Sequence, residues 1–215
     1  MSKIRTLSDL QDHLDRAIAW RLKEIAYVKS SAKSAKSYAQ AALVRAGLPL
    51  VYAHWEGFVK QASEFYLEYV DNQGLKYSEL ATCFFVFGIK KHVATLIDSR
   101  QAVANIEAVD FIRKAGEQKA SLTLSNAINT ASNLSSLVFF NIASSLGISL
   151  DAYHAYSNFI DKSLVDRRNK IAHGEYLDLD AESFEGISEQ VLVLMRMYKN
   201  DVENLASMSA YRIPP

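Results

Sequence analysis

The 215-residue sequence has a single cysteine, three prolines and eight glycines, and its 24 basic residues equal its 24 acidic residues. One cysteine, Cys83, excludes a disulfide framework or a Cys/His zinc cluster within one chain, and we expect it to serve as buried apolar filler. So few prolines and glycines leave long uninterrupted helices possible. A net charge of zero argues against a broad basic surface for nucleic acid, so any RNA contact has to be local.

The sequence also lacks a charged amino-terminal segment followed by an apolar stretch, and no segment approaches the roughly 20 apolar residues that span a bilayer. These absences predict a cytoplasmic protein without a membrane segment. The hydrophobic content of 49% is enough for one domain with a sizeable core. We therefore expect a single helical domain over residues 1–210 and a frayed tail over residues 211–215.

Apolar residues recur at helical spacing and predict an all-α bundle of about five to six helices. Ser8 and Gln11 have the spacing of a capping box, so the first helix is expected from about Ser8 to Lys29. The polar stretch 30–37 is either a helical extension or a loop. A second long helix should be interrupted or kinked near Gly47 and Pro49. Further helices are expected over 78–97, 135–146, 150–173 and 181–208, with a loop or small hairpin near 118–133.

The second helix carries aromatic side chains mostly at three, four or seven residue intervals. They are Tyr52, Trp55, Phe58, Phe65, Tyr66 and Tyr69. An aromatic stripe at this spacing is typical of a core face, and base stacking is the alternative.

The most concentrated chemistry lies near the end of the predicted 150–173 helix, where Arg168, Asn169 and His173 precede Gly174. At about 100° per residue, Arg168 projects into the apolar arc of the helix, so its guanidinium needs a partner or a pocket. Asn169 and His173 lie four residues apart on the polar face. Gly174 fits the left-handed position that ends a helix, which places His173 at the helix C-terminus.

Residues 168–175 resemble the R-N-x-x-x-H signature of the HEPN superfamily, all-helical domains many of which are metal-independent ribonucleases. Segments within 4–24, 52–60 and 132–134 resemble landmarks of one bacterial branch of HEPN-like nucleases. The resemblance therefore runs from about Ile4 to Tyr176. It implies a HEPN-type helical bundle that needs no metal and no cofactor and cleaves RNA through attack of its 2′-hydroxyl on the adjacent phosphate.

The resemblance assigns catalytic roles to three residues. His173 handles a proton, Arg168 stabilises charge on the phosphate, and Asn169 orients the histidine or binds phosphate. Arg167 and Lys170 are the candidate substrate-binding cations.

Glu56 has two interpretations. It has the spacing of a surface ion pair with Lys60, or it packs toward the motif and holds Arg168 or His173 in place.

The resemblance also implies a homodimer, in which two motifs meet, and a toxin of a toxin–antitoxin or phage-defence system with a cognate antitoxin. One alternative is a non-catalytic HEPN domain that binds RNA, nucleotide or a protein partner. Another is a toxin silenced by nucleotide transfer onto a tyrosine in an H-x-Y pattern. Here Tyr176 lies one residue later than that pattern requires.

Overall fold

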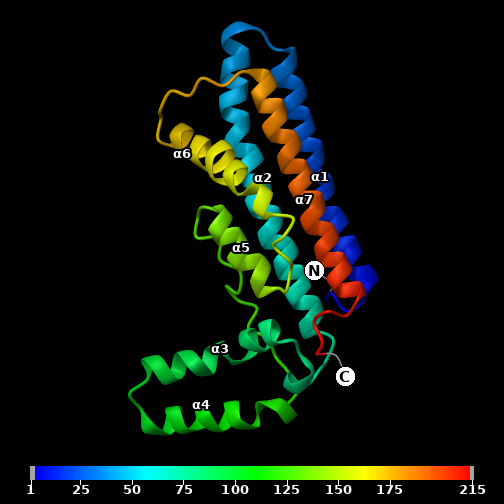
Figure 1. Ribbon diagram of the computed structural model, residues 1–215, viewed down its shortest axis with the longest axis vertical. Helices are drawn as coiled ribbons and strands as arrows, with labels where there is room; N and C mark the ends of the chain where they lie inside the picture. The colour runs from blue at the N-terminus through cyan, green and yellow to red at the C-terminus, as the bar shows by residue number, and fades with distance from the viewer. Residues whose placement is uncertain (1–2, 214–215) are drawn as a thin grey trace.

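The computed structural model describes residues 3–213, which form seven α-helices, short 3-10 and π-helical segments and no strand. Three long helices lie side by side as a spine (Figure 1): α1 (Leu7–Ser34), α2 (Ser37–Asp71) and α7 (Ala181–Ser207). At one end of the spine, α3 (Thr82–Asp98) and α4 (Ala102–Lys114) form a projecting hairpin, here called the arm. Two shorter helices, α5 (Ser136–Ser145) and α6 (Arg167–Ala172), lie beside the spine. The all-α prediction is confirmed, with slightly more helices than expected.

The spine is held together by a continuous apolar core to which α2 contributes the aromatic stripe. Trp55 and Phe58 are fully buried, and the Trp55 ring lies 5.1 Å from that of Phe139, which joins α5 to the spine. A Cβ atom at Gly47 would lie 2.6 Å from Cζ of Phe184. A larger residue there would therefore push α2 and α7 apart. The prediction that these aromatic residues form core rather than a stacking surface is confirmed for all but the half-buried Phe65.

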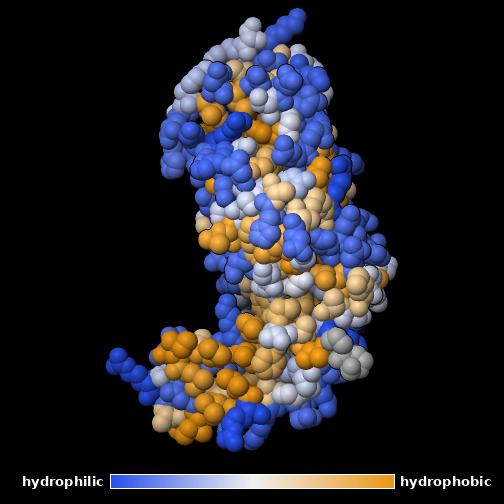
Figure 2. Space-filling model, in the orientation of Figure 1, coloured by the Kyte–Doolittle hydropathy of each residue, from blue (hydrophilic) through white to orange (hydrophobic). Residues whose placement is uncertain are grey.

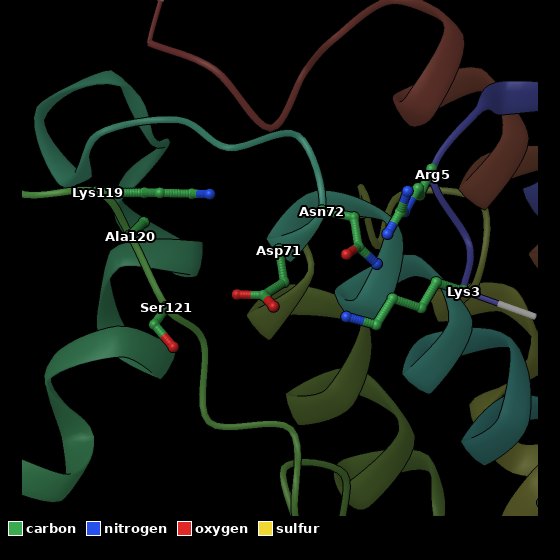
Figure 3. A pocket seen from close by; sticks show the side chains of 7 residues that line it. All are labelled: Lys3, Arg5, Asp71, Asn72, Lys119, Ala120 and Ser121. Atoms are coloured by element: carbon green, nitrogen blue, oxygen red, sulfur yellow. The ribbon is translucent and has the colours of Figure 1, made fainter.

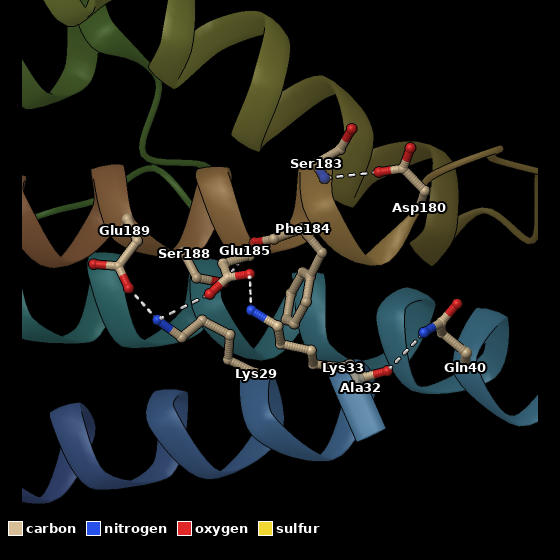
Figure 4. Close-up of polar contacts among 10 residues, drawn as sticks. All are labelled: Lys29, Ala32, Lys33, Gln40, Asp180, Ser183, Phe184, Glu185, Ser188 and Glu189. Carbon is tan, nitrogen blue, oxygen red and sulfur yellow. Dashed lines mark hydrogen bonds and ion pairs between the residues drawn. The ribbon is translucent and has the colours of Figure 1, made fainter. Parts of the chain in front are cut away.

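Polar contacts join α1 and α7 where these two helices meet at the surface (Figure 4). Lys29 pairs with both Glu185 and Glu189, and Lys33 lies 3.0 Å from Glu185. Asp180 caps α7 by accepting a hydrogen bond from the Ser183 amide at 2.7 Å. The ion pairs are partly exposed and contribute little each, so the apolar core supplies most of the spine's stability.

The first helix begins at Leu7, one residue earlier than its sequence predicts, and has a different cap. Thr6 and Asp9 form the capping box, not Ser8 and Gln11. The amide of Asp9 donates to Oγ1 of Thr6 at 3.1 Å, and the Thr6 amide donates to the Asp9 carboxylate at 2.9 Å. Burial of Ile4, which is 1% exposed, anchors the chain just before this cap. The burial of Ile4 therefore favours the capping box of Thr6 and Asp9 over the overlapping pattern of Ser8 and Gln11.

Two other expectations, a break in α2 and a frayed C-terminal tail, need correction, and one open alternative is decided. α2 runs unbroken through Gly47 and Pro49, because its buried neighbours Leu48 and Val51 hold it in the core. For residues 118–133, where a loop or a small hairpin was expected, the structure has an irregular loop without a strand. Residues 211–213 are not frayed: the Ala81 amide donates to the Tyr211 carbonyl at 2.8 Å and the Ile213 amide to the Glu79 carbonyl at 2.9 Å. Residues 214–215 lie outside the described residues.

The polar stretch after the first predicted helix is largely helical, since α1 continues to Ser34. Of the helices described between residues 3 and 213, none has the length and apolar character that a membrane crossing requires.

Candidate functional site

The motif lies at the end of a helical run that changes character along its length. A 3-10 turn (His154–Tyr156) leads into a π-helical segment (Phe159–Asp166), which continues directly as α6. The wider π segment departs from the uniform 100° spacing used above, yet Ile160, Leu164 and Val165 all face the core. Such segments are rare and occur frequently at functional sites.

Asp161 fixes the π segment to α5. Its carboxylate accepts hydrogen bonds from the amide of Ser136 at 2.8 Å and from the hydroxyl of Ser136 at 2.6 Å. Ser136 is the first residue of α5, so the negative charge also complements the positive end of that helix dipole. The start of the motif-bearing run is therefore held in place before the motif begins.

α6 ends where the sequence predicts. Gly174 has φ +77°, its amide donates to the Ile171 carbonyl at 3.0 Å, and the Glu175 amide donates to the Lys170 carbonyl at 2.9 Å. These two bonds make a Schellman motif, for which a left-handed residue is needed. The turn leaves His173 exposed at the helix C-terminus.

Arg168 is held from three directions. Its guanidinium carbon lies 4.1 Å from the centre of the Tyr52 ring on α2. Nη1 donates to Oδ1 of Asn169 at 2.8 Å, and Nη2 donates to the Ser132 carbonyl at 3.1 Å. A guanidinium has five N–H donors, so these two hydrogen bonds use fewer than half of them. The side chain is half-buried, which agrees with its predicted projection toward the apolar side of the helix.

Tyr52 also holds the loop that contacts Arg168. Its phenolic oxygen accepts a hydrogen bond from the Leu134 amide at 2.6 Å. Within this loop, Ala131 and Ser132 have φ of +54° and +57°, a left-handed conformation that costs about 1 to 3 kcal/mol per non-glycine residue. Burial raises the pKa of Tyr52, so the phenol stays neutral and its oxygen is a hydrogen-bond acceptor without charge. One side chain on α2 thus anchors both the arginine and a strained loop.

The other predicted site residues lie on the same end of the molecule. Asn169 is half-buried and bonded to Arg168, so in this conformation it orients the arginine and not His173. Arg167 is half-buried, whereas Lys170 and His173 are exposed. The motif therefore presents a cationic surface with one fixed guanidinium and one accessible imidazole.

Within residues 3–213, Glu56 forms an ion pair neither with Lys60 nor with Arg168 or His173, the alternatives that its sequence position left open. Among the ion pairs of residues 3–213, none includes Glu56, Lys60 or Arg168. Tyr52, one helical turn earlier on α2, offers its aromatic face to the guanidinium instead. Tyr52 and Glu56 lie on the same side of α2, and α6 packs against α2 at the level of Tyr52.

Arg45 is a further residue at this site that the sequence patterns did not indicate. Its Nη2 donates to the Glu175 carbonyl at 3.0 Å, which ties the segment after His173 to α2. Its guanidinium also lies 6.0 Å from the ring of Tyr176. With 130 residues between Arg45 and Glu175, no local pattern could have revealed this contact.

A separate polar pocket of about 580 Å³ lies at the other end of α2 (Figure 3), lined by Lys3, Arg5, Asp71, Asn72, Lys119, Ala120 and Ser121. Its cations surround the C-terminus of α2, where the helix dipole favours positive charge. The Asp71 carboxylate in it accepts a hydrogen bond from the Leu122 amide at 2.7 Å. The pocket lies about 28 Å along α2 from Tyr52, so it is not part of the motif site.

Within residues 3–213, no group of three His, Cys, Asp or Glu side chains is placed to hold a metal ion.

The family model described as HEPN_MAE_28990-like HEPN matches residues 10–211, which span nearly the whole chain and include the spine, the arm and the motif. No curated protein and no solved structure matches the chain. Because the family match covers far more than half of the sequence, the chain belongs to the HEPN_MAE_28990-like HEPN family.

Proposed function

We propose that this HEPN protein is a metal-independent endoribonuclease with its site at Arg168, Asn169 and His173. The observation that carries the proposal is the placement of Arg168. Its guanidinium is fixed by Tyr52, Asn169 and the Ser132 carbonyl, and the two hydrogen bonds use only two of its five N–H groups.

The proposed reaction uses the substrate's own nucleophile. The 2′-hydroxyl of RNA attacks the adjacent phosphorus, the bond to the 5′-oxygen breaks, and the products are a cyclic phosphate and a free 5′-hydroxyl. His173 transfers a proton to or from one of these oxygens, which is the usual role of a histidine in general acid–base catalysis. Arg168 donates to the phosphate oxygens as negative charge develops on them.

Arg167 and Lys170 would guide the phosphate backbone to the site. Both belong to α6, and neither forms an ion pair with another residue of 3–213. Their contribution would be electrostatic and would weaken with added salt. Glu56, which lies one turn from Tyr52, would have an indirect role at most, through the charge it places near that phenol.

A homodimer in which two motifs face each other would complete the site, because one chain supplies a single copy of each catalytic group. The corresponding biological role is that of a toxin restrained by an antitoxin. The family relationship and the cationic motif surface support this role. Growth arrest on expression of the native chain, but not of His173→Ala, would be the matching cellular result.

A cleavage assay on single-stranded RNA tests the proposal. Cleavage should persist in excess EDTA and should stop when every 2′-hydroxyl is replaced by hydrogen, because the nucleophile is then absent. Arg168→Ala and His173→Ala should each lower the rate by about 10² to 10⁴-fold. His154→Ala and Arg16→Ala are matched controls, because both residues are exposed and lie outside the motif.

Two outcomes would contradict the proposal: loss of cleavage in EDTA, or full activity in both folded motif variants. RNA binding without cleavage by the native chain would instead favour a non-catalytic HEPN domain.

A further inference from the structure

The pocket at the C-terminal end of α2 has no part in the proposed reaction. Exposed hydrophobic side chains gather over the arm (Figure 2), whereas this pocket of about 580 Å³ is lined by polar side chains except for Ala120. In Figure 3 the side chains of Lys3, Arg5 and Lys119 extend toward the cavity from two sides. The amino-terminal segment and the loop that follows α4 therefore bring three cations to one cavity.

Hydrogen bonds of the backbone fix both walls of the cavity. On the side of the amino-terminal segment, the Ile4 side chain is 1% exposed and the Ile4 carbonyl accepts a hydrogen bond from Nδ2 of Asn72 at 3.0 Å. On the side of Lys119, the Ala120 amide donates to the Leu75 carbonyl at 2.8 Å. A ligand would therefore meet cations on a backbone that is already ordered, which lowers the entropic cost of binding.

The three cations are not engaged by the protein itself. They are exposed, and they form no ion pair with any residue of 3–213. The last carbonyls of α2 accept hydrogen bonds from the side-chain amides of Asn72 and Gln73, both at 2.9 Å. Capping of α2 therefore does not account for the cations.

The lining carries more positive than negative charge. Three cations face one carboxylate, that of Asp71, and the C-terminal dipole of α2 adds about half a negative charge. Two nearby carboxylates, Asp9 and Glu68, accept hydrogen bonds from amides of the amino-terminal segment and do not line the cavity. Because a cleft with a surplus of one sign concentrates ions of the opposite sign, the pocket favours an anion.

Asp71 adds a second requirement to the ligand. Its Oδ1 accepts a hydrogen bond from the Leu122 amide at 2.7 Å, so Oδ2 is left to face the cavity. An ionised carboxylate oxygen can only accept, so it suits a hydroxyl on the ligand. Among the described residues that line the pocket, none is aromatic, so a base would find no stacking partner. Lysine and arginine together suit the several oxygens of a phosphate group.

We infer that this pocket binds a phosphate group together with the hydroxyl of the ribose beside it, as presented by the backbone of single-stranded RNA or by a free ribonucleotide. Lys3, Arg5 and Lys119 contact the phosphate oxygens, and Asp71 accepts a hydrogen bond from the 2′-hydroxyl. The base is not recognised. The pocket lies about 28 Å along α2 from Tyr52, so binding there does not depend on cleavage at the motif.

Fluorescence anisotropy with labelled single-stranded RNA tests the cations, in the His173→Ala background so that the RNA stays intact. Lys119→Gln and Arg5→Gln should each remove one phosphate contact, which lowers the salt slope of log K by about 0.7 and raises Kd about fivefold at roughly 0.1 M salt. Lys23→Gln and Arg16→Gln are the matched controls, because both residues are exposed on α1 and neither lines the pocket. The controls should bind RNA as the native side chains do.

Asp71→Asn tests the hydroxyl contact, since it keeps an acceptor for the Leu122 amide. RNA should bind more tightly than DNA of the same sequence, and Asp71→Asn should reduce that preference, whereas Lys119→Gln should weaken both ligands alike. An unchanged preference for RNA in Asp71→Asn would overturn the inference.

Calorimetry with adenosine 5′-monophosphate distinguishes the two sources of the ligand. Binding that Lys119→Gln weakens would identify a free ribonucleotide, and RNA binding without it would identify the RNA backbone. RNA and nucleotide affinities that are both insensitive to Lys119→Gln and Arg5→Gln would overturn the inference. Absence of cleavage by the native chain, with these binding results intact, would contradict the ribonuclease proposal alone.

Discussion

The α7 helix of the spine is held by buried side chains, whereas the α6 helix carries the motif and is held by a few polar contacts. α7 buries ten residues, whereas α6 buries none. Side chains of α7 are therefore constrained by packing, and a change in them should alter the free energy of unfolding. Side chains of α6 are constrained by a few specific polar contacts, so a change in them should affect a ligand more than the fold.

The largest expected difference comes from truncating a spine residue and a motif residue in parallel. Trp55→Ala should lower the free energy of unfolding by about 3 to 5 kcal/mol, because it leaves a cavity in the centre of the core. Arg168→Ala should lower it by about 1 kcal/mol, the scale of an exposed cation–π contact. Urea denaturation followed by circular dichroism measures both values. Losses of equal size would remove the distinction between the two regions.

Tyr52 belongs to both regions, because it is a core residue of the spine and supports Arg168. Tyr52→Phe should cost about 1 to 3 kcal/mol of stability, because the Leu134 amide loses its acceptor, yet it keeps the ring beneath the guanidinium. Tyr52→Leu should be less stable than Tyr52→Phe, because the smaller side chain leaves space in the core. It should also cleave RNA at least about tenfold more slowly than Tyr52→Phe, because the ring that positions Arg168 is gone. Urea denaturation and single-turnover cleavage distinguish the two effects.

Tyr66→Phe is the matched control for the hydroxyl. Tyr66 is fully buried, and its hydroxyl has no hydrogen-bond partner in the structure, so the substitution should leave stability unchanged or increased. Equal cleavage rates for Tyr52→Phe and Tyr52→Leu would count against a positioning role for the ring.

The smallest expected effect is a pH dependence of the spine. Burial lowers the pKa of His54, the neighbouring Arg21 acts in the same direction, and Glu24, 2.8 Å from Nε2, opposes them. The folded state thus disfavours the protonated form of His54, whereas the unfolded chain takes up a proton near pH 6.5. Stability should therefore fall as the pH drops below about 6.5.

His54→Gln should reduce that slope, since the variant has no group titrating at this position. Thermal unfolding between pH 7.5 and 5 measures it, with exposed His154→Gln as the control. An unchanged slope in His54→Gln would show that other groups cause the pH dependence.

The sequence by itself determined the helical class, the aromatic core face of α2 and the end of the motif helix at Gly174. Each depends on local spacing: apolar residues at helical intervals must share a face, and a glycine after the last turn provides the left-handed residue that a Schellman motif needs. The R-N-x-x-x-H pattern is also local, which is why its residues could be named before the fold was known.

Only the tertiary structure decided what Arg168 touches. Its contacts with Tyr52 and with the Ser132 carbonyl join segments 116 and 36 residues away in the chain. No sequence spacing specifies such a meeting, because it depends on how α6 packs against α2 and on a loop held in a strained conformation. The same reasoning explains why Thr6 and not Ser8 caps α1 and why α2 continues through Pro49, because each depends on which distant surfaces pack together.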